Sequence, residues 1–254
     1  MLSAELRGNA LVTGGGRGIG ANVARELARA GMEVWVTGRT RAQVESVATE
    51  IGGHALVGDV SNRADVARWA GAVERLDLLV CNAGASGPSE PLAEVDEWWR
   101  TFEINVLGIY LCCRVFAPRM VDQGSGRIVN VASGSAYLPI TGDNPNTAYP
   151  ASKAAVHRFS EALAAHLAPQ NVFVFSISPG LVRTEMTEHF GDDAPWTPPE
   201  CAPRLVHALA TGEFDRLAGR YLHAEHDPPE KLRERVDEIL AGDLNAIRLR
   251  RDSQ

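Results

Sequence analysis

Short apolar runs alternate with amphipathic segments along most of this chain, and this alternation constrains the fold more than any other feature. The apolar runs lie at residues 10–14, 33–38, 54–59, 77–84, 126–133, 171–180 and 219–225. The segments with helical spacing lie at 20–31, 41–52, 63–76, 94–122, 149–168 and 200–212. Strand and helix in regular alternation predict βαβ units and a parallel sheet covered on both faces. We therefore expect a doubly wound parallel sheet in a three-layer α/β/α arrangement, as one domain over residues 1–254.

Bulk properties exclude several classes of function. The 254 residues carry a formal net charge of −7, which argues against a nucleic-acid partner. No run of 18 apolar residues and no basic leader before an apolar stretch are visible, so we expect no membrane span, no signal peptide and a cytoplasmic protein. None of the four cysteines forms a C-x-x-C pair, so we expect reduced, buried thiols.

A glycine-rich turn follows the first strand. Gly14, Gly18 and Gly20 stand in the stretch TGGGRGIG, directly before the first helix. Glycines at such a junction permit a tight turn and the close approach of backbone N–H groups to a pyrophosphate. A glycine turn without a ligand is the alternative, but the position between a first strand and a first helix favours dinucleotide binding.

The end of the second strand bears on which dinucleotide binds. Enzymes that use NAD usually place an acidic residue there, whereas an arginine suits the 2′-phosphate of NADP. This strand ends at Gly38, followed by Arg39, and Arg17 in the glycine turn can reach the same region. Two guanidinium groups and no carboxylate favour NADP(H) over NAD(H). In this arginine-rich chain, the alternative is that Arg39 merely begins a solvated helix.

Tyr149 and Lys153 stand four residues apart on a predicted helix. The chain has two lysines against 23 arginines, so a lysine here is notable. Residues at this spacing share one helical face, and a fixed cation lowers the pKa of a neighbouring phenol. An ammonium is compact enough to do this while holding a sugar hydroxyl. The pair could still be coincidental if it stood alone.

With the other motifs, the sequence resembles the short-chain dehydrogenase/reductase family over about residues 8–225. The family's Y-x-x-x-K corresponds to Tyr149 and Lys153, and its T-G-x-x-x-G-x-G to residues 13–20. Its N-A-G corresponds to residues 82–84, and the stretch SPGLVRT at 178–184 resembles the segment that holds the nicotinamide carboxamide. The resemblance implies a Rossmann-like fold and hydride transfer between a nicotinamide cofactor and a carbonyl or secondary alcohol.

The resemblance implies four catalytic residues. Ser133 would hydrogen-bond the substrate oxygen, and Tyr149 would act as general acid or base. Lys153 would lower the pKa of the tyrosine and bind the nicotinamide ribose, and Asn105 would support a relay water. Asp59 would contact the adenine. The residues that we assign to the cofactor are Thr13, Gly14, Gly16, Arg17, Gly18, Ile19, Gly20, Arg39, Asp59, Val60, Asn82, Ala83, Gly84, Tyr149, Lys153, Pro179, Gly180, Val182 and Thr184.

The substrate pocket is where the chain departs from the family pattern. Fifteen residues separate Ser133 from Tyr149, where the family usually has about twelve, and this makes Ser135 a rival for the catalytic serine. We prefer Ser133, because it follows the strand end as in the family. We expect Ser135, Tyr137, Met186 and Phe190 to line the substrate pocket, with residues 185–200 as a lid. The apolar lid residues predict a substrate that is at least partly apolar.

Other features lead to weaker expectations. A charged helical tail begins at about residue 228 and is expected to pack on its own subunit. His223 and His226 are expected on opposite faces of a strand end, so no metal site is predicted. The resemblance also implies a homodimer or homotetramer that pairs helices at about 98–122 and 149–168. Two alternatives stay open: an NAD(H)-dependent alcohol dehydrogenase on the same scaffold, and a catalytically idle dinucleotide sensor.

Overall fold

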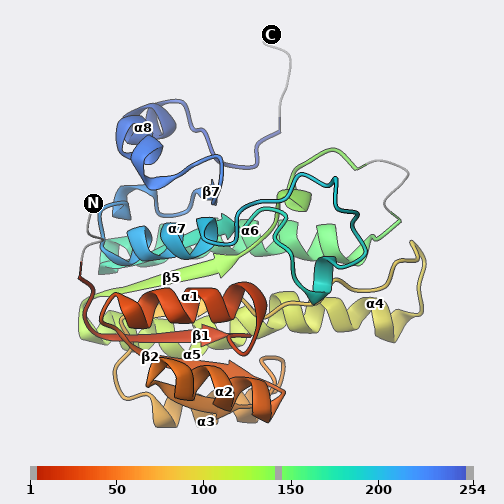
Figure 1. Ribbon diagram of the computed structural model, residues 1–254. Helices are drawn as coiled ribbons and strands as arrows, with labels where there is room; N and C mark the ends of the chain where they lie inside the picture. The colour runs from red at the N-terminus through yellow and green to blue at the C-terminus, as the bar shows by residue number, and fades with distance from the viewer. Residues whose placement is uncertain (1–4, 141–144, 250–254) are drawn as a thin grey trace.

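A single seven-stranded sheet forms the centre of the protein in the computed structural model, which describes residues 5–140 and 145–249 (Figure 1). All six strand pairings are parallel, and the order is β3-β2-β1-β4-β5-β6-β7. The strands are β1 Asn9–Thr13, β2 Glu33–Gly38, β3 His54–Val57, β4 Leu78–Cys81, β5 Gly126–Val131, β6 Val172–Ser178 and β7 Tyr221–His223. This confirms the predicted doubly wound α/β class and the single domain.

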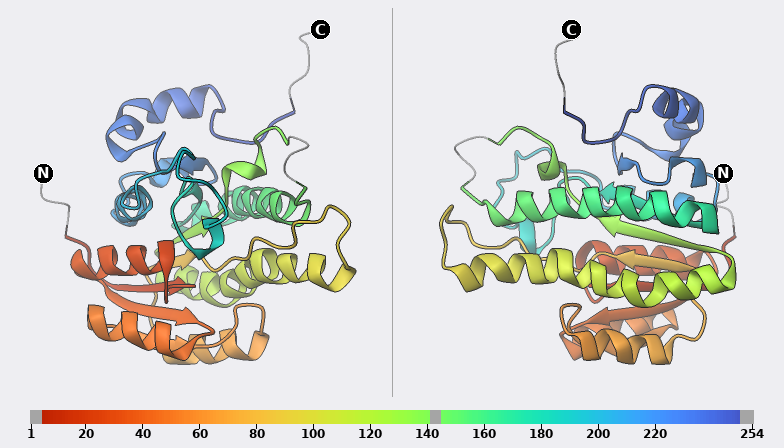
Figure 2. Two further views of the ribbon diagram at one scale, coloured as in Figure 1. Left: turned by 45° about the vertical axis from the view of Figure 1, so that its right-hand side comes forward. Right: turned by 180° about the vertical axis from the view of Figure 1, so that it is seen from behind.

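Helices cover both faces of the sheet, which gives the three predicted layers (Figures 1 and 2). The longer helices are α1 Gly18–Arg29, α2 Arg41–Ile51, α3 Arg63–Ala72, α4 Val95–Phe102, α5 Gly108–Gln123, α6 Ala148–Leu167, α7 Cys201–Ala210 and α8 Pro229–Ala241. One apolar core joins the sheet to α1, α2, α7 and α8, and the other joins it to α3, α5 and α6. The strands are nearly continuous apolar runs because both faces are buried in this way.

The connection between β4 and β5 contains a π-helix. Residues Glu103–Leu107 form this element, η1, between α4 and α5, so that one continuous helix runs from Val95 to Gln123. This helix is long and apolar enough to span a membrane by length and composition alone, although charged residues interrupt its apolar run. Half of its most apolar stretch is buried inside the protein, as in the core helix of a globular domain.

The C-terminal tail folds back onto the domain, as expected. Leu232 and Ile239 of α8 are fully buried in the core, and the chain then turns through Asp243 and Asn245, both with left-handed backbones. The Asn245 carbonyl oxygen accepts a hydrogen bond from the Tyr221 N–H at 2.8 Å, and its amide nitrogen donates to the Tyr221 carbonyl oxygen at 2.9 Å. The tail therefore lies along the outer edge of β7.

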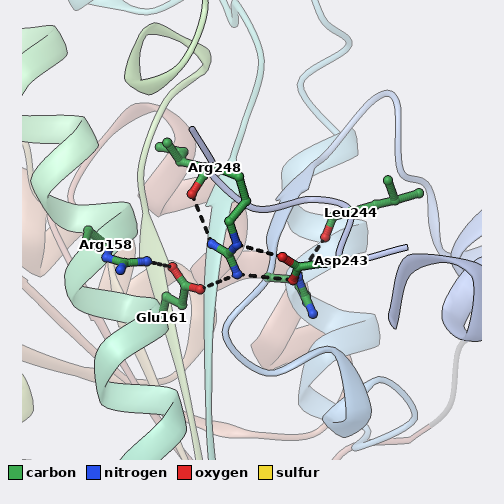
Figure 3. A network of polar contacts seen from close by, with 7 residues as sticks. Arg158, Glu161, Asp243, Leu244 and Arg248 are labelled. Carbon is green, nitrogen blue, oxygen red and sulfur yellow. Dashed lines mark hydrogen bonds and ion pairs between the residues drawn. The ribbon is translucent and has the colours of Figure 1, made fainter. Parts of the chain in front are cut away.

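Arg248 attaches this tail to helix α6. Its guanidinium forms ion pairs with Glu161 of α6 and with Asp243, each at 2.7 Å (Figure 3). Glu161 also pairs with Arg158, one turn earlier on α6, and Asp243 also pairs with Arg220. The helix that carries Tyr149 and Lys153 is thus linked to the end of the described chain.

Candidate active site

A cleft of about 460 Å³ lies at the carboxyl ends of the strands, where a doubly wound sheet binds its ligands. Most of the predicted cofactor residues line it: Gly14, Gly16, Arg17, Gly18, Ile19, Arg39, Asp59, Val60, Asn82, Ala83, Gly84, Tyr149, Lys153, Pro179 and Thr184. Met186 lines it from the predicted substrate set. The predicted residues that are not in its lining are Thr13, Gly20, Asn105, Ser133, Ser135, Tyr137, Gly180, Val182 and Phe190.

Several lining residues were not predicted. Thr40, Gln43 and Val44 come from the start of α2, and Ile104 comes from the π-helix. Arg183 and Glu185 come from the segment after β6. The start of α2 follows directly on Arg39, so its position after the second strand was the available signal. Ile104 had no such signal, because only the irregular helix brings it to the cleft.

The glycine turn leaves no room for side chains. Gly14 and Gly18 have φ angles of +63° and +54°, which favour glycine. A Cβ atom at Gly20 would lie 2.4 Å from both the Asn82 side-chain nitrogen and the Gly14 carbonyl oxygen. The turn therefore keeps its backbone exposed to the cleft beside the start of α1. A dinucleotide pyrophosphate fits a cradle of this kind.

Thr13 and Asn82 brace the turn from behind. The Thr13 hydroxyl accepts hydrogen bonds from the backbone N–H groups of Asn82 at 3.0 Å and Ala83 at 3.1 Å. The Asn82 side chain donates to the carbonyl oxygens of Thr13 and Gly14 at 3.0 and 3.2 Å. These two residues hold the ends of β1 and β4 in register. They shape the cleft, and Thr13 does so without lining it.

The two predicted arginines lie in different surroundings. Arg39 is exposed at the start of α2, beside Thr40, whose side chain does not cap that helix. Arg17 instead forms an ion pair with Glu185, which reaches across the cleft from the lid side. A Cβ atom at Gly38 would lie 3.0 Å from a Val44 methyl group, so an acidic side chain would be crowded there. Arg39 is the more available cation at this end of the cleft.

Asp59 is held in place by two neighbours. Arg100 donates to one of its carboxylate oxygens at 2.7 Å, and the N–H and hydroxyl of Ser61 donate to the other. Burial raises the pKa of Asp59, but the hydrogen bonds from Ser61 and Arg100 outweigh it and hold the pKa below its usual range. Each carboxylate oxygen of Asp59 already accepts a hydrogen bond within the protein, so an adenine ring would have to share these oxygens with Ser61 or Arg100.

Tyr149 lies at the start of α6, with its ring in the cleft lining. Burial raises the pKa of Tyr149, and a hydrogen bond with the Ser133 side chain opposes this rise. Ser133 also accepts hydrogen bonds from the N–H of Ser135 at 3.2 Å and from its hydroxyl at 3.0 Å. Ser133 therefore acts on the phenol of Tyr149, and Ser135 is hydrogen-bonded to Ser133.

Lys153 lies one turn further along α6 and is buried. Its Nζ donates to the Val131 carbonyl oxygen at 2.8 Å and lies 5.6 Å from the centre of the Tyr149 ring. Burial lowers the pKa of Lys153 to about 8. In this arrangement burial of the phenol, and not the Lys153 ammonium, has the largest influence on the pKa of Tyr149.

Asn105 stands in the π-helix and is fully buried. Its side-chain nitrogen donates to the Ala85 carbonyl oxygen at 3.0 Å and to the Ser152 hydroxyl at 2.9 Å. Its side-chain oxygen accepts from the Ala85 N–H at 2.8 Å. The side chain therefore fastens the turn after β4 to helix α6, next to Lys153.

The predicted lid is a braced loop. Thr184 and Thr187 form a capping box around the short helix η4, Glu185–Thr187. The Arg183 guanidinium lies 4.3 Å from the centre of the Trp196 ring and pairs with Asp192. At its far end, Thr197 donates to Glu225 at 2.6 Å. Trp196 thus supports the loop from within.

The histidine pair corrects one expectation. The rings of His223 and His226 are stacked, with their centres 4.2 Å apart, so they do not lie on opposite faces. In the described parts of the chain, no group of three or more metal-binding side chains is gathered. The four cysteines, Cys81, Cys112, Cys113 and Cys201, are free thiols.

A parallel sheet, a glycine cradle, and a tyrosine with a buried lysine one helical turn away are typical of dinucleotide-binding oxidoreductases. Residues 8–195 match the short chain dehydrogenase family. A short chain dehydrogenase from Monascus purpureus is 35% identical over 260 residues, which cover 94% of this chain and 87% of that protein. The chain therefore belongs to the short-chain dehydrogenase/reductase family and is an oxidoreductase that acts on CH–OH donors.

Two solved structures are also similar. A gluconate 5-dehydrogenase from Burkholderia cenocepacia, in complex with NADP and tartrate, has a TM-score of 0.77 at 26% identity and covers 85% of this chain and 92% of its own. A 3-ketoacyl-(acyl-carrier-protein) reductase from Brucella melitensis, complexed with NADH, has a TM-score of 0.79 at 30% identity and covers 85% and 95%. Members of this fold thus bind either nicotinamide cofactor.

Proposed function

We propose that the protein is an NADP(H)-dependent oxidoreductase that interconverts a carbonyl compound and a secondary alcohol. The observation that carries this proposal is a group of three side chains at the dinucleotide cleft: Tyr149 lines it, Ser133 lies close enough to oppose the rise in the tyrosine pKa, and Lys153 lies one helical turn away. A protein that only sensed the cofactor would need the cleft but not this group. NADP(H), when bound, supplies or accepts the hydride.

Each side chain then has a role set by its position. Ser133 donates a hydrogen bond to the substrate oxygen, and Tyr149 transfers the proton to or from that oxygen. Lys153 offers a buried cation to the ribose side of the cleft, with its Nζ held by the Val131 carbonyl oxygen one helical turn from Tyr149. Asn105 holds the turn after β4 against α6, so its side chain positions the site. The π-helix that carries Asn105 would support the relay water.

The experiment that tests this activity is NADPH oxidation across a panel of ketones and aldehydes, with wild type beside Tyr149→Phe. We expect turnover in the wild type and a loss of at least about 10³-fold in the variant, because the proton donor is removed. NADPH binding should persist, since the ring remains. Retained turnover in Tyr149→Phe would remove this residue from the mechanism.

The cofactor preference rests on Arg39. Its exposed guanidinium, the uncapped N-terminus of α2 and the crowded position at Gly38 together favour a 2′-phosphate. One observation favours the NAD(H) alternative: Glu185 forms an ion pair with Arg17, so the Arg17 guanidinium is less available to a 2′-phosphate. We expect Arg39→Gln to weaken NADPH binding about tenfold or more and to leave NADH binding nearly unchanged.

Arg41 provides a matched control for this test. It is also exposed on the first turn of α2, but it pairs with Glu45 at 2.8 Å. Arg41→Gln should change neither dissociation constant by more than about twofold. Equal affinity of the wild type for NADPH and NADH would contradict the assignment.

We also propose a homo-oligomer that pairs helices α5 and α6 between copies. Trp99 and Tyr110, both exposed, lie on the long helix, and the Tyr110 ring contacts Phe159 of α6 edge-on. Light scattering should give a dimer or tetramer, and Tyr110→Glu should shift it towards the monomer. A wild-type monomer would contradict the proposal.

A further inference from the structure

We infer that the substrate is an uncharged carbonyl compound with an apolar body, and that carboxylate- or phosphate-bearing substrates are disfavoured. This inference rests on the proposed carbonyl–alcohol oxidoreductase function and narrows it to a substrate class. It is carried by the side chains on the loops around the Ser133–Tyr149 pair. These loops follow β4, β5 and β6 and gather at one end of the sheet (Figures 1 and 2).

Two of these loops present large apolar side chains to solvent. Tyr137, Leu138 and Ile140 follow Ser133 and are 48%, 53% and 60% exposed. Met186 and Phe190, in the lid, are 38% and 45% exposed. Large apolar side chains that gather at the mouth of a binding site mark a surface that becomes covered by an apolar ligand.

The first apolar loop is supported from below. The Tyr137 ring packs edge-on against the buried Tyr221 ring, with centres 5.0 Å apart. The Leu138 side chain lies close to Gly134, where a Cβ atom would be 3.2 Å from it. These contacts hold Tyr137 and Leu138 in place, so their exposed apolar atoms belong to a formed surface.

The unpaired charges on the same loops are negative. Residues 183–193 contain four carboxylates, of which Asp192 pairs with Arg183 and Glu185 pairs with Arg17. Glu188 and Asp193, both exposed, have no cation among these eleven residues to offset them. The loop after β4 adds Glu90 and Glu94, while residues 134–140 carry no charge.

An anionic substrate would therefore approach the site past the exposed carboxylates of these loops. Like charges raise the free energy of the encounter, and the effect is screened by salt over about 10 Å at 0.1 M. A sugar acid or an acyl group on a phosphate-bearing carrier meets this repulsion. A neutral ketone does not, and its hydrocarbon part covers the apolar loop residues.

A matched pair of ketones tests the inference: 2-octanone and 7-oxooctanoate, which share the methyl ketone and differ at the far end of the chain. We expect kcat/KM with NADPH at low ionic strength to be at least about tenfold higher for 2-octanone. The difference should narrow as sodium chloride is added. Turnover of both compounds should disappear in Tyr149→Phe.

Two variants separate charge from shape. The double variant Glu188→Gln, Asp193→Asn should raise kcat/KM for 7-oxooctanoate several-fold and change that for 2-octanone by less than about twofold. Glu234→Gln, an exposed position on α8, is the control and should change neither. Leu138→Gln should raise KM for 2-octanone, because it removes apolar contact.

The outcomes distinguish the two proposals. Equal or higher kcat/KM for 7-oxooctanoate, with turnover that still requires Tyr149, would overturn the inferred substrate class and leave the carbonyl reduction standing. No response of the oxo acid to salt or to the double variant would also overturn it. Turnover of neither ketone would count against the proposed function, and the inference would fall with it.

Discussion

Lys153 is buried, and that burial gives its ammonium a pH dependence within the working range of an enzyme. Its pKa is lowered to about 8. Below that pH the side chain is a cation, and above it the charge is lost. We expect the dissociation constant of NADPH to rise as pH increases from 7 to 9.5, because the anionic cofactor loses an attractive partner.

Fluorescence titration of NADPH at half-unit pH intervals measures this effect. Lys153→Met is the comparison, since it keeps the length of the side chain and removes its charge. The inflection near pH 8 should be absent from the variant. An inflection of the same size in both proteins would assign it to another group.

His157 is a second buried base, on the same helix. It is fully buried, neither ring nitrogen has a hydrogen-bond partner within the described chain, and its ring packs against Tyr221. Burial lowers the pKa of His157; Glu161 opposes this and the nearby arginines add to it. The unfolded state therefore binds a proton more readily, so this group lowers stability as pH falls below about 6.5.

We expect His157→Phe to reduce the loss of stability between pH 7 and pH 5.5. Urea unfolding of both proteins at several pH values measures it, and the difference between the two curves isolates this residue from the carboxylates. At pH 5.5 the variant should be at least as stable as the wild type, since it also removes two unpaired buried nitrogens. A constant difference across this pH range would contradict the assignment.

The sequence predicted the identity of most cleft residues, because glycine turns and the Tyr–Lys spacing are local patterns. Local patterns cannot show which distant residue forms an ion pair with a long side chain. Arg17 was assigned to a phosphate, but the fold brings Glu185 to it from 168 positions later. Ser133 and Ser135 could be ranked from the sequence only by family likeness, and the preference for Ser133 stays a prediction; in the fold the two hydroxyls are hydrogen-bonded to each other, and Ser133 acts on the pKa of Tyr149.

The π-helix η1 is the element on which the site depends most. It places Asn105 so that three hydrogen bonds join the turn after β4 to α6, and it turns Ile104 to the cleft. We expect Asn105→Ala to lower the free energy of unfolding by about 2–4 kcal/mol, because buried partners at Ala85 and Ser152 lose their bonds.

Urea unfolding measures this change, and Ser152→Ala is the milder comparison because it removes only one of the three bonds. At a low temperature at which both proteins stay folded, kcat of Asn105→Ala should be lower than that of the wild type, because the turn beside the cleft loosens. An unchanged free energy of unfolding would mean that these bonds are replaced by others.

At the level of whole elements, the seven strands and the main helices were predictable from periodicity, because burial on both faces demands apolar strands. The π-helix was not, since it has the same apolar spacing as the α-helix around it. The braced lid was not predictable either. Its stability comes from Trp196, Thr197 and Glu225, which meet only in the folded chain.

The C-terminal tail contributes to the stability of the whole molecule. A variant that ends at Gly242 loses the Asn245 bonds to β7 and the Arg248 pairs to Glu161 and Asp243. We expect it to be less stable by about 1–3 kcal/mol. Arg248→Gln alone should cost less than about 1 kcal/mol, because these ion pairs are partly exposed. Thermal unfolding of the three proteins tests this order.

The tail has a further consequence at the rim of the sheet. An edge strand with free N–H and C=O groups is a template on which another chain can pair. Here the N–H of Tyr221 is taken by Asn245, and the N–H of His223 is taken by the Asp227 carboxylate at 2.9 Å. The backbone groups that would start a cross-chain ladder are therefore already satisfied, and the tail keeps concentrated copies of the protein from joining into a growing sheet at this side.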